Sequence, residues 1–268
     1  MNRLRLSMTC LLIIALDSCA LAHDTWLIPD RFVVERDSVV TLDLTSGMAF
    51  PGLDTSIKPE RIDRAFCRLA GHRFELTDYS SAPKSLLFKA RLSESGVATI
   101  WIELKPRSLV LTTKLVKEYL DEIGAPEVIR QQWANAKRPR RWREAYTKHS
   151  KTFVRVGEAQ SDRSWAEPVG MQLEIVPEKD PTTLRVGDEL AVRVLKNGAP
   201  LPNFSVGIVN AGDAKGRIQK TDAEGRATFR LDRGGRWLVR VTELRKSSQA
   251  GIDWESNFTT LTFQVGSE

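Results

Sequence analysis

Apolar and polar residues alternate along the first part of the chain in short runs, which glycine and proline residues separate. Four runs, Arg31–Leu44, His72–Tyr79, Ser85–Leu92 and Gly96–Leu104, alternate with the period of two that is typical of a strand with one buried face. No helical pattern alternates with these runs, as it would in a parallel sheet with crossover helices. The pattern therefore predicts an antiparallel β-sandwich that begins near His23.

A helical pattern follows these strands. Leu115–Gly124 has apolar residues at helical spacing and ends on a glycine, and Ala125–Lys137 has a proline near its start, where helices tolerate it. Arg141–Gly157 has the pattern of a helix that continues into a strand. We therefore predict a helical insertion over about residues 115–151, within or after the first sandwich.

The last part of the chain again has the strand pattern. Its predicted strands are Met171–Glu178, Glu189–Leu195, Phe204–Asn210, Arg226–Leu231, Arg236–Leu244 and Thr259–Val265. The Asn197–Gly198 pair and Gly225 supply turns between them. These strands indicate an immunoglobulin-like or transthyretin-like sandwich. The predicted fold is mainly β, with two antiparallel β-sandwich domains over residues 23–170 and 171–268.

Residues 1–22 have the features of an export signal. Arg3 and Arg5 form a basic start, Met8–Leu16 is an apolar core too short to span a bilayer, and Ala20 and Ala22 occupy small-residue cleavage positions. We expect cleavage between Ala22 and His23, and a periplasmic or secreted protein. In the alternative, Leu16–Cys19 serves as a lipoprotein box, and a lipid on Cys19 attaches the protein to a membrane.

Composition narrows the classes of partner and chemistry. The net charge is +6, and much of the basic excess lies in Lys137–Arg143, which we interpret as the solvated face of a helical segment. Exported proteins seldom meet nucleic acid and no recognition motif is present, so we expect no nucleic-acid partner. Signal removal leaves one cysteine, Cys67, which excludes an internal disulfide. Standard catalytic motifs are missing from the sequence, and we expect no enzyme activity.

His23 is the candidate residue with the most distinctive chemistry. Cleavage after Ala22 would give it a free α-amine beside its imidazole, and these two nitrogens together can chelate Cu(II), Ni(II) or Zn(II). Asp24 could add an oxygen ligand. In the alternative, the N-terminal histidine frays or caps the first strand without a metal. His149 follows Tyr146 by three residues, so a helix would place both on one face, where a structural histidine is favoured over a ligand.

Several longer segments resemble one known family. They are "HDTWLIPD", "EAYTKHSKTFVRVG", "LEIVPEKDPTTLRVGDELAVRVLKNGAPLPN", "TDAEGRATFRLDRGGRWLVRV" and "DWESNFTTLTFQV". Together they are similar, in order, to the DUF4198 family of exported proteins, some of which are described as nickel or cobalt uptake accessory proteins. The resemblance implies a β-sandwich scaffold that handles a transition metal in the periplasm, with His23 as the natural ligand.

The chain departs from this family at two positions. Relatives often carry Val-His-Met after the strand that corresponds to "WLVRV", where this chain has Val241–Thr242–Glu243. Relatives also often carry a histidine in the turn that is Gly47–Met48–Ala49 here. A site built from those histidines would be lost, or rebuilt here with Met48, Glu243 or His149.

Two functions follow as hypotheses. The first is a periplasmic accessory protein that binds Ni, Co or Cu through His23, Asp24 and His149, and captures the ion or delivers it to a metal-uptake transporter. The second is a non-catalytic interaction module that binds a protein or glycan at the cell envelope. In either case the protein would contact a membrane only if it is lipidated at Cys19.

Overall fold

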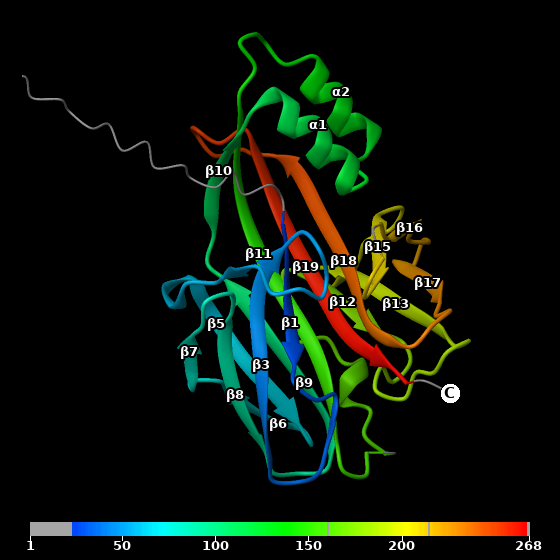
Figure 1. The fold of residues 1–268 in the computed structure, drawn as a ribbon. Coiled ribbons are helices and arrows are strands. Elements are labelled where there is room, and N and C mark those ends of the chain that lie inside the picture. The colour runs from blue at the N-terminus through cyan, green and yellow to red at the C-terminus, as the bar shows by residue number, and fades with distance from the viewer. Residues whose placement is uncertain (1–22, 160, 214, 267–268) are drawn as a thin grey trace, which may run out of the picture.

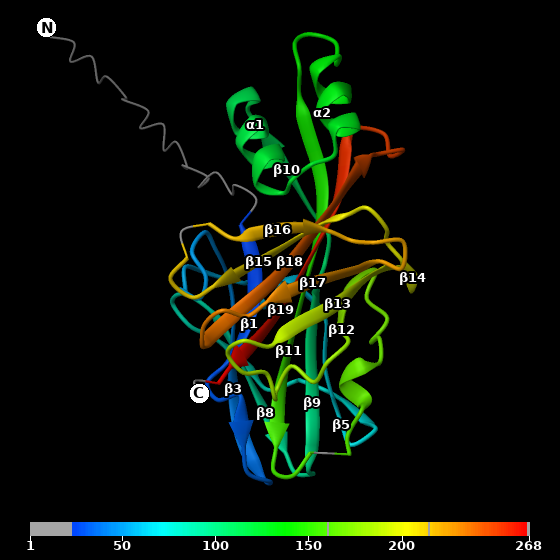
Figure 2. The same ribbon diagram turned by 90° about the vertical axis from the view of Figure 1, so that its right-hand side faces the viewer.

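The computed structural model describes residues 23–159, 161–213 and 215–266, in which three β-sheets and two α-helices form a mainly β fold (Figures 1 and 2). The mainly β class with antiparallel sheets that the sequence predicts is therefore confirmed. None of the helices in these residues is long and apolar enough to cross a bilayer.

The first sheet carries the N-terminal strand at its edge. Its strand order is β1-β3-β8-β7, and the short strand β4 pairs with β3. All of these pairs are antiparallel. The bounds are β1 Asp24–Pro29, β3 Ser38–Gly47, β4 Thr55–Ser56, β7 Tyr79–Ser81 and β8 Leu86–Leu92.

The second sheet is the largest and contains ten strands. Its order is β16-β15-β18-β19-β11-β9-β5-β6, and β2 and β10 also pair with β11. The bounds are β2 Val33–Val34, β5 Ile62–Leu69, β6 His72–Glu75, β9 Gly96–Leu104, β10 Arg107–Leu111, β11 Trp142–Val156, β15 Ser205–Asn210, β16 Arg217–Lys220, β18 Gly235–Lys246 and β19 Trp254–Val265.

The third sheet belongs to the last part of the chain. In it β12 (Leu173–Pro177), β13 (Glu189–Lys196) and β14 (Ala199–Pro200) pair in order, and β17 (Arg226–Arg230) also pairs with β13, on the edge opposite β12. This sheet and β15, β18 and β19 enclose an apolar core that includes Val192, Phe229, Trp237, Val239 and Phe263. The first sheet and β5, β9 and β11 enclose another, which includes Leu27, Leu42, Phe88, Ile100 and Val154.

The second sheet runs through both sandwiches because β11 and β19 pair in parallel. Their register extends from Glu144 beside Trp254 to Thr152 beside Thr262. Farther along, β11 pairs with β9 in antiparallel register. Strands from the two predicted domains, 23–170 and 171–268, therefore hydrogen-bond to each other within one sheet, although each sandwich keeps its own core.

Two helices pack at one end of these long strands (Figure 1). They are α1 (Thr113–Glu122), where the Thr112 hydroxyl accepts from the Leu115 amide at 3.5 Å, and α2 (Glu127–Ala134), which begins after Pro126. Their buried faces join an aromatic cluster in which the Trp142 and Trp254 rings stack with centroids 4.4 Å apart.

The predicted helical insertion over residues 115–151 is correct for both helices but wrong after Trp142. Trp142–Val156 forms β11, a strand of fifteen residues, so Tyr146 and His149 are strand residues and lie on opposite faces. Arg, Glu, Ala and Lys in this stretch favour a helix in isolation. Pairing with β19 on one edge and with β9 and β10 on the other overrides that preference.

A buried carboxylate joins α1 to this strand pair. Glu144 is fully buried and accepts hydrogen bonds from the Trp142 indole at 2.6 Å, from the Tyr119 hydroxyl at 3.0 Å and from the Ser256 hydroxyl. Burial raises the pKa of Glu144 above its ordinary value, and the three donors partly offset that effect. The network ties α1, β11 and β19 together.

We predict that Tyr119→Phe lowers the free energy of unfolding by about 1–3 kcal/mol, because it removes one donor from a buried carboxylate. Urea unfolding followed by tryptophan fluorescence measures the change. Tyr79→Phe is the matched control, since Tyr79 is 39% exposed. Equal effects of the two substitutions would show that the bond to Glu144 contributes nothing.

Candidate functional site around His23

Hydroxyl groups of the central sheet hold β1 in place. The hydroxyls of Ser150 and Thr260 both donate to the Thr25 carbonyl, at 2.9 and 2.6 Å, and the Thr262 hydroxyl donates to the Leu27 carbonyl. These side chains come from the paired strands β11 and β19 and are buried. The first strand therefore lies directly on the face of the parallel pair.

The same face of β11 fixes His23. The buried ammonium of Lys148 donates to the His23 carbonyl, one strand repeat away from the Ser150 contact. The imidazole of His23 is half-buried. Burial, and then the charge of Lys148, lower its pKa below the ordinary value of 6.5. His23 is therefore held at the start of β1 as a neutral histidine at pH 7.

His23 lines a cavity of about 220 Å³ between the first sheet and β11. Basic and hydroxyl side chains make up most of its wall, and none of the described residues that line it is acidic. The lining residues are His23, Ser46, Thr55, Ser56, Ile57, Lys58, Arg61, Leu104, Arg107, Tyr146 and Lys148.

Four cationic side chains surround this cavity: Lys58, Arg61, Arg107 and Lys148. Within the described part of the chain, none of them forms an ion pair with a carboxylate, whereas Arg240 and Lys196 do. Burial lowers the pKa of Lys148 to about 8, so its ammonium is still mostly charged at pH 7. The described lining of the cavity therefore carries positive charge only, although Asp24, Glu144 and Glu122 act on Lys148 from outside that lining.

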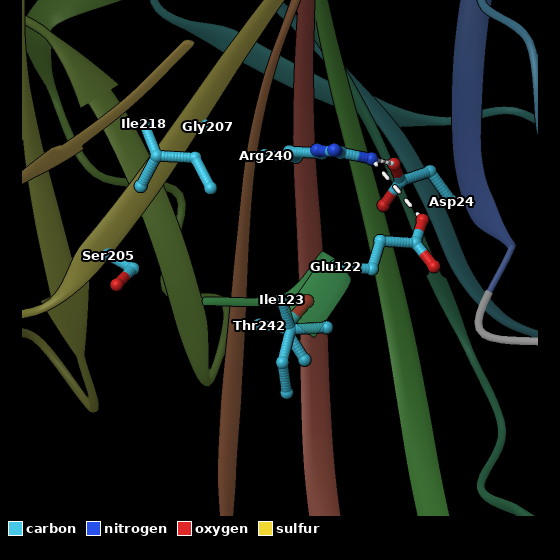
Figure 3. Close-up of a pocket in the computed structure, with 8 residues that line it drawn as sticks. All are labelled: Asp24, Glu122, Ile123, Ser205, Gly207, Ile218, Arg240 and Thr242. Atoms are coloured by element: carbon cyan, nitrogen blue, oxygen red, sulfur yellow. Dashed lines mark hydrogen bonds and ion pairs between the residues drawn. The ribbon is translucent and has the colours of Figure 1, made fainter. Parts of the chain in front are cut away.

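Asp24 is not among the residues that line this cavity and is already paired with Arg240 (Figure 3). Its carboxylate lies 2.6 Å from the Arg240 guanidinium, which also lies 3.6 Å from the carboxylate of Glu122 at the end of α1. Asp24 raises the pKa of Arg240, and burial followed by Asp24 raises the pKa of Glu122. The charge of Asp24 serves to connect β1, β18 and α1.

The structure does not bring His149 to His23. His149 follows Lys148 in β11 and so points to the opposite face of the strand, where its Nδ1 lies 4.0 Å from the Glu103 carboxylate. The ring is 5% exposed, and neither ring nitrogen has a hydrogen-bond partner among the described residues. Burial lowers its pKa to about 4. The predicted ligand set of His23, Asp24 and His149 therefore does not assemble.

The residues at or beside the family's histidine positions, Thr242, Glu243 and Met48, also do not gather at one site. Thr242 lines a small hollow that Asp24 and Arg240 also line (Figure 3). Glu243 is buried on the other face of β18, where it pairs with Lys196 and accepts from the Asn257 amide at 2.7 Å. Met48 is 60% exposed beside a larger cavity of about 480 Å³. The described residues contain no group of three or more His, Cys, Asp or Glu side chains that could hold a metal ion.

Sequence reasoning identified His23 but missed the cationic residues around it. Lys58 and Arg61 flank a short 3-10 helix (Pro59–Arg61), Arg107 begins β10, and Lys148 lies within β11. No spacing connects positions so far apart. The one available signal is the alternation of Tyr146, Lys148 and Ser150 on a single face of β11, which becomes visible only once the segment is recognised as a strand.

The fold and this site define a mainly β protein whose first strand begins at a cationic cavity. The chain belongs to the family DUF4198, a domain of unknown function, whose sequence model matches residues 20–243. A search of the curated proteins finds no match.

Several solved structures show weak similarity. An alpha-2-macroglobulin of Salmonella is 11% identical, with a TM-score of 0.25, over 90% of this chain and 15% of its own length. The adhesin InvE of Yersinia pseudotuberculosis is 11% identical, with a TM-score of 0.24, over 89% of this chain and 58% of its own length. The adhesin FdeC of Escherichia coli is 14% identical, with a TM-score of 0.25, over 92% and 64%. At TM-scores this low, the similarity identifies neither a ligand nor a partner.

The buried His149 predicts a specific loss of stability in acid. Between pH 6.5 and about pH 4, unfolded His149 takes up a proton while folded His149 stays neutral, so the free energy of unfolding falls as the pH falls. The pKa difference corresponds to about 3 kcal/mol. We predict that His149→Gln removes this part of the pH dependence in urea unfolding at pH 7 to 4, whereas His72→Gln, at an exposed position, leaves it intact. A parallel pH profile for wild type and His149→Gln would contradict the prediction.

Proposed function

We propose that the protein is a non-catalytic periplasmic accessory protein that captures a transition-metal ion, Ni(II), Co(II) or Cu(II), through His23 after cleavage behind Ala22. The observation that supports the proposal is the attachment of β1. The Lys148 ammonium and the Ser150, Thr260 and Thr262 hydroxyls hold the first residues against the central sheet. A histidine whose backbone carbonyl is held in this way does not fray, so the start of β1 keeps a fixed position.

The ligands would be the two nitrogens of His23. A neutral imidazole and a neutral α-amine form a chelate, and nitrogen ligands suit these ions, with copper bound most tightly. Asp24 stays in its ion pair with Arg240, and His149 lies behind the sheet, so we assign neither residue a bond to the ion. Ligands that the ion brings with it would then fill its other coordination positions, and the adjoining cavity has room for them.

Delivery would follow to a metal-uptake transporter or another envelope protein. The site lies at the start of the first strand, with His23 half-buried rather than enclosed, so a receiving protein can reach it. If Cys19 is lipidated instead, the α-amine of His23 is part of a peptide bond, and only the ring remains as a ligand.

A second candidate function is the envelope interaction module, which requires no metal. The cavity of about 480 Å³ beside β1 supports it, because aromatic and carboxylate side chains line it together. Trp26, Phe50, Asp121 and Glu122 are among these residues. Such a mixed wall suits an uncharged polar ligand such as a glycan.

Adding one alanine before His23 distinguishes a chelate through both nitrogens of His23 from binding through its ring alone. In the protein cleaved after Ala22, an alanine placed before His23 removes the α-amine from the site and leaves the imidazole. We predict that this extension weakens Ni(II) and Cu(II) binding by roughly thirtyfold, about 2 kcal/mol, because one metal–nitrogen bond and the proximity of the two donors are lost. Titration with a competing chelator at fixed pH measures the affinity, after intact mass spectrometry has verified the N-terminus.

His72→Ala is the control for this experiment, since His72 is exposed on β6 and far along the chain from β1. It should leave the affinity unchanged. Equal affinities of the cleaved and extended proteins would exclude the α-amine as a ligand. Binding no tighter than about 0.1 mM in either form would favour the interaction module.

A further inference from the structure

The cavity beside His23 has a charge that its proposed metal cargo does not explain. Lys58, Arg61, Arg107 and Lys148 come from three separate segments and line one space of about 220 Å³ without any acidic residue in its described lining. The Arg61 guanidinium and the Lys148 ammonium lie 5.8 and 5.5 Å from the centre of the same Tyr146 ring. Besides burial, the charge of Arg61 lowers the pKa of Lys148, so these two cations repel each other, and an anion between them would offset that repulsion.

Some other basic side chains of the described residues do pair with carboxylates. Arg143 pairs with Asp253, Arg226 with Glu178, and Arg240 with Asp24. Carboxylates are therefore available in this sequence to balance cations next to the sandwiches. The cavity wall itself contains hydroxyl groups and no carboxylate, although the effect of burial, which lowers the pKa of Lys148, is partly offset by Asp24, Glu144 and Glu122 outside that wall. An anion that enters the cavity would balance the charge of Lys58, Arg61 and Arg107.

The donors in the cavity wall are of the kind that oxyanions accept from. Lys148 donates one hydrogen bond to the His23 carbonyl, and an ammonium has three N–H groups. Arg61 donates through Nη2 to the Lys105 carbonyl at 2.9 Å, while its buried Nε has no partner among the described residues. Guanidinium and ammonium groups form strong, charge-assisted hydrogen bonds with carboxylate and phosphate oxygens.

We infer that this cavity is a binding site for a small multivalent oxyanion, the chemistry that polycarboxylates and phosphate share. The volume fits this class, since cavities for drug-sized ligands are larger, about 300–1,000 Å³. The inference also specifies the metal cargo, and in that respect it rests on the proposed function. Four cations repel a bare divalent ion next to His23, whereas they attract an ion that carries an anionic chelator.

Isothermal titration of metal-free, cleaved protein with citrate and with inorganic phosphate at pH 7 tests the site. We expect at least one of the two to bind with a Kd below about 1 mM. The double variant Lys58→Gln/Arg107→Gln should weaken that binding about tenfold or more, because it removes two charge-assisted contacts. Both side chains are exposed, so the variant should fold normally.

Lys220→Gln/Arg230→Gln is the matched control, because it removes the same charge at exposed positions of β16 and β17. It should change the affinity less than twofold. The relative affinities for citrate and phosphate then distinguish the two kinds of oxyanion. No binding of either anion by the wild type, or an equal loss in both double variants, would overturn the anion site.

A second titration separates this inference from the proposed function. Ni(II) alone and Ni(II) with citrate are compared on the cleaved and alanine-extended proteins. If the anion binds metal-free protein but extension changes nothing for the nickel complex, the oxyanion site stands and the His23 chelate fails. If Ni(II) alone binds the cleaved protein and neither anion binds, the chelate stands and the oxyanion site fails.

Discussion

The parallel pairing of β11 with β19 is the constraint on which the other parts of this fold depend. It connects strands that lie about a hundred residues apart in the sequence and makes one sheet out of parts of two sandwiches. Both faces of the pair are covered, by β1 on one side and by β12 on the other. The position of His23 follows from this pairing, because the side chains that hold β1 come from both paired strands.

The buried charges on the two faces of this sheet reinforce that arrangement. On the face toward β12, Lys151 pairs with Glu174, which also accepts from three backbone amides at residues 169–171. On the face toward the helices, Glu144 is satisfied by three donors. Removing one partner of a buried ion pair such as that of Lys151 with Glu174 typically costs about 3–5 kcal/mol, and removing one donor from Glu144 costs about 1–3 kcal/mol. These contacts therefore specify one arrangement of the segments around β11.

The sequence predicts the alternating strands, and also Gly96–Leu104, an apolar strand that is buried along almost its whole length, but it misses two other buried segments. Leu86–Leu92 alternates clearly and was predicted almost to the residue, whereas Asp24–Pro29 is buried along its whole length and has no alternation. In β11, buried Lys148, His149 and Lys151 look like the polar face of a helix. The candidate site was likewise predicted only in part. His23 follows from a cleavage pattern, but its cationic neighbours meet only through the tertiary fold.

The shared sheet also limits how the two sandwiches can move relative to each other. Many two-lobed binding proteins close around a ligand by rotation about a hinge and open again to release it. Here nine consecutive residue pairs of β11 and β19 cross from one sandwich to the other, and a rotation between the sandwiches would have to break this ladder. A clamshell movement between the sandwiches is therefore excluded by this ladder, and under the proposed function cargo would leave the cavity when a receiving protein competes for the ligand.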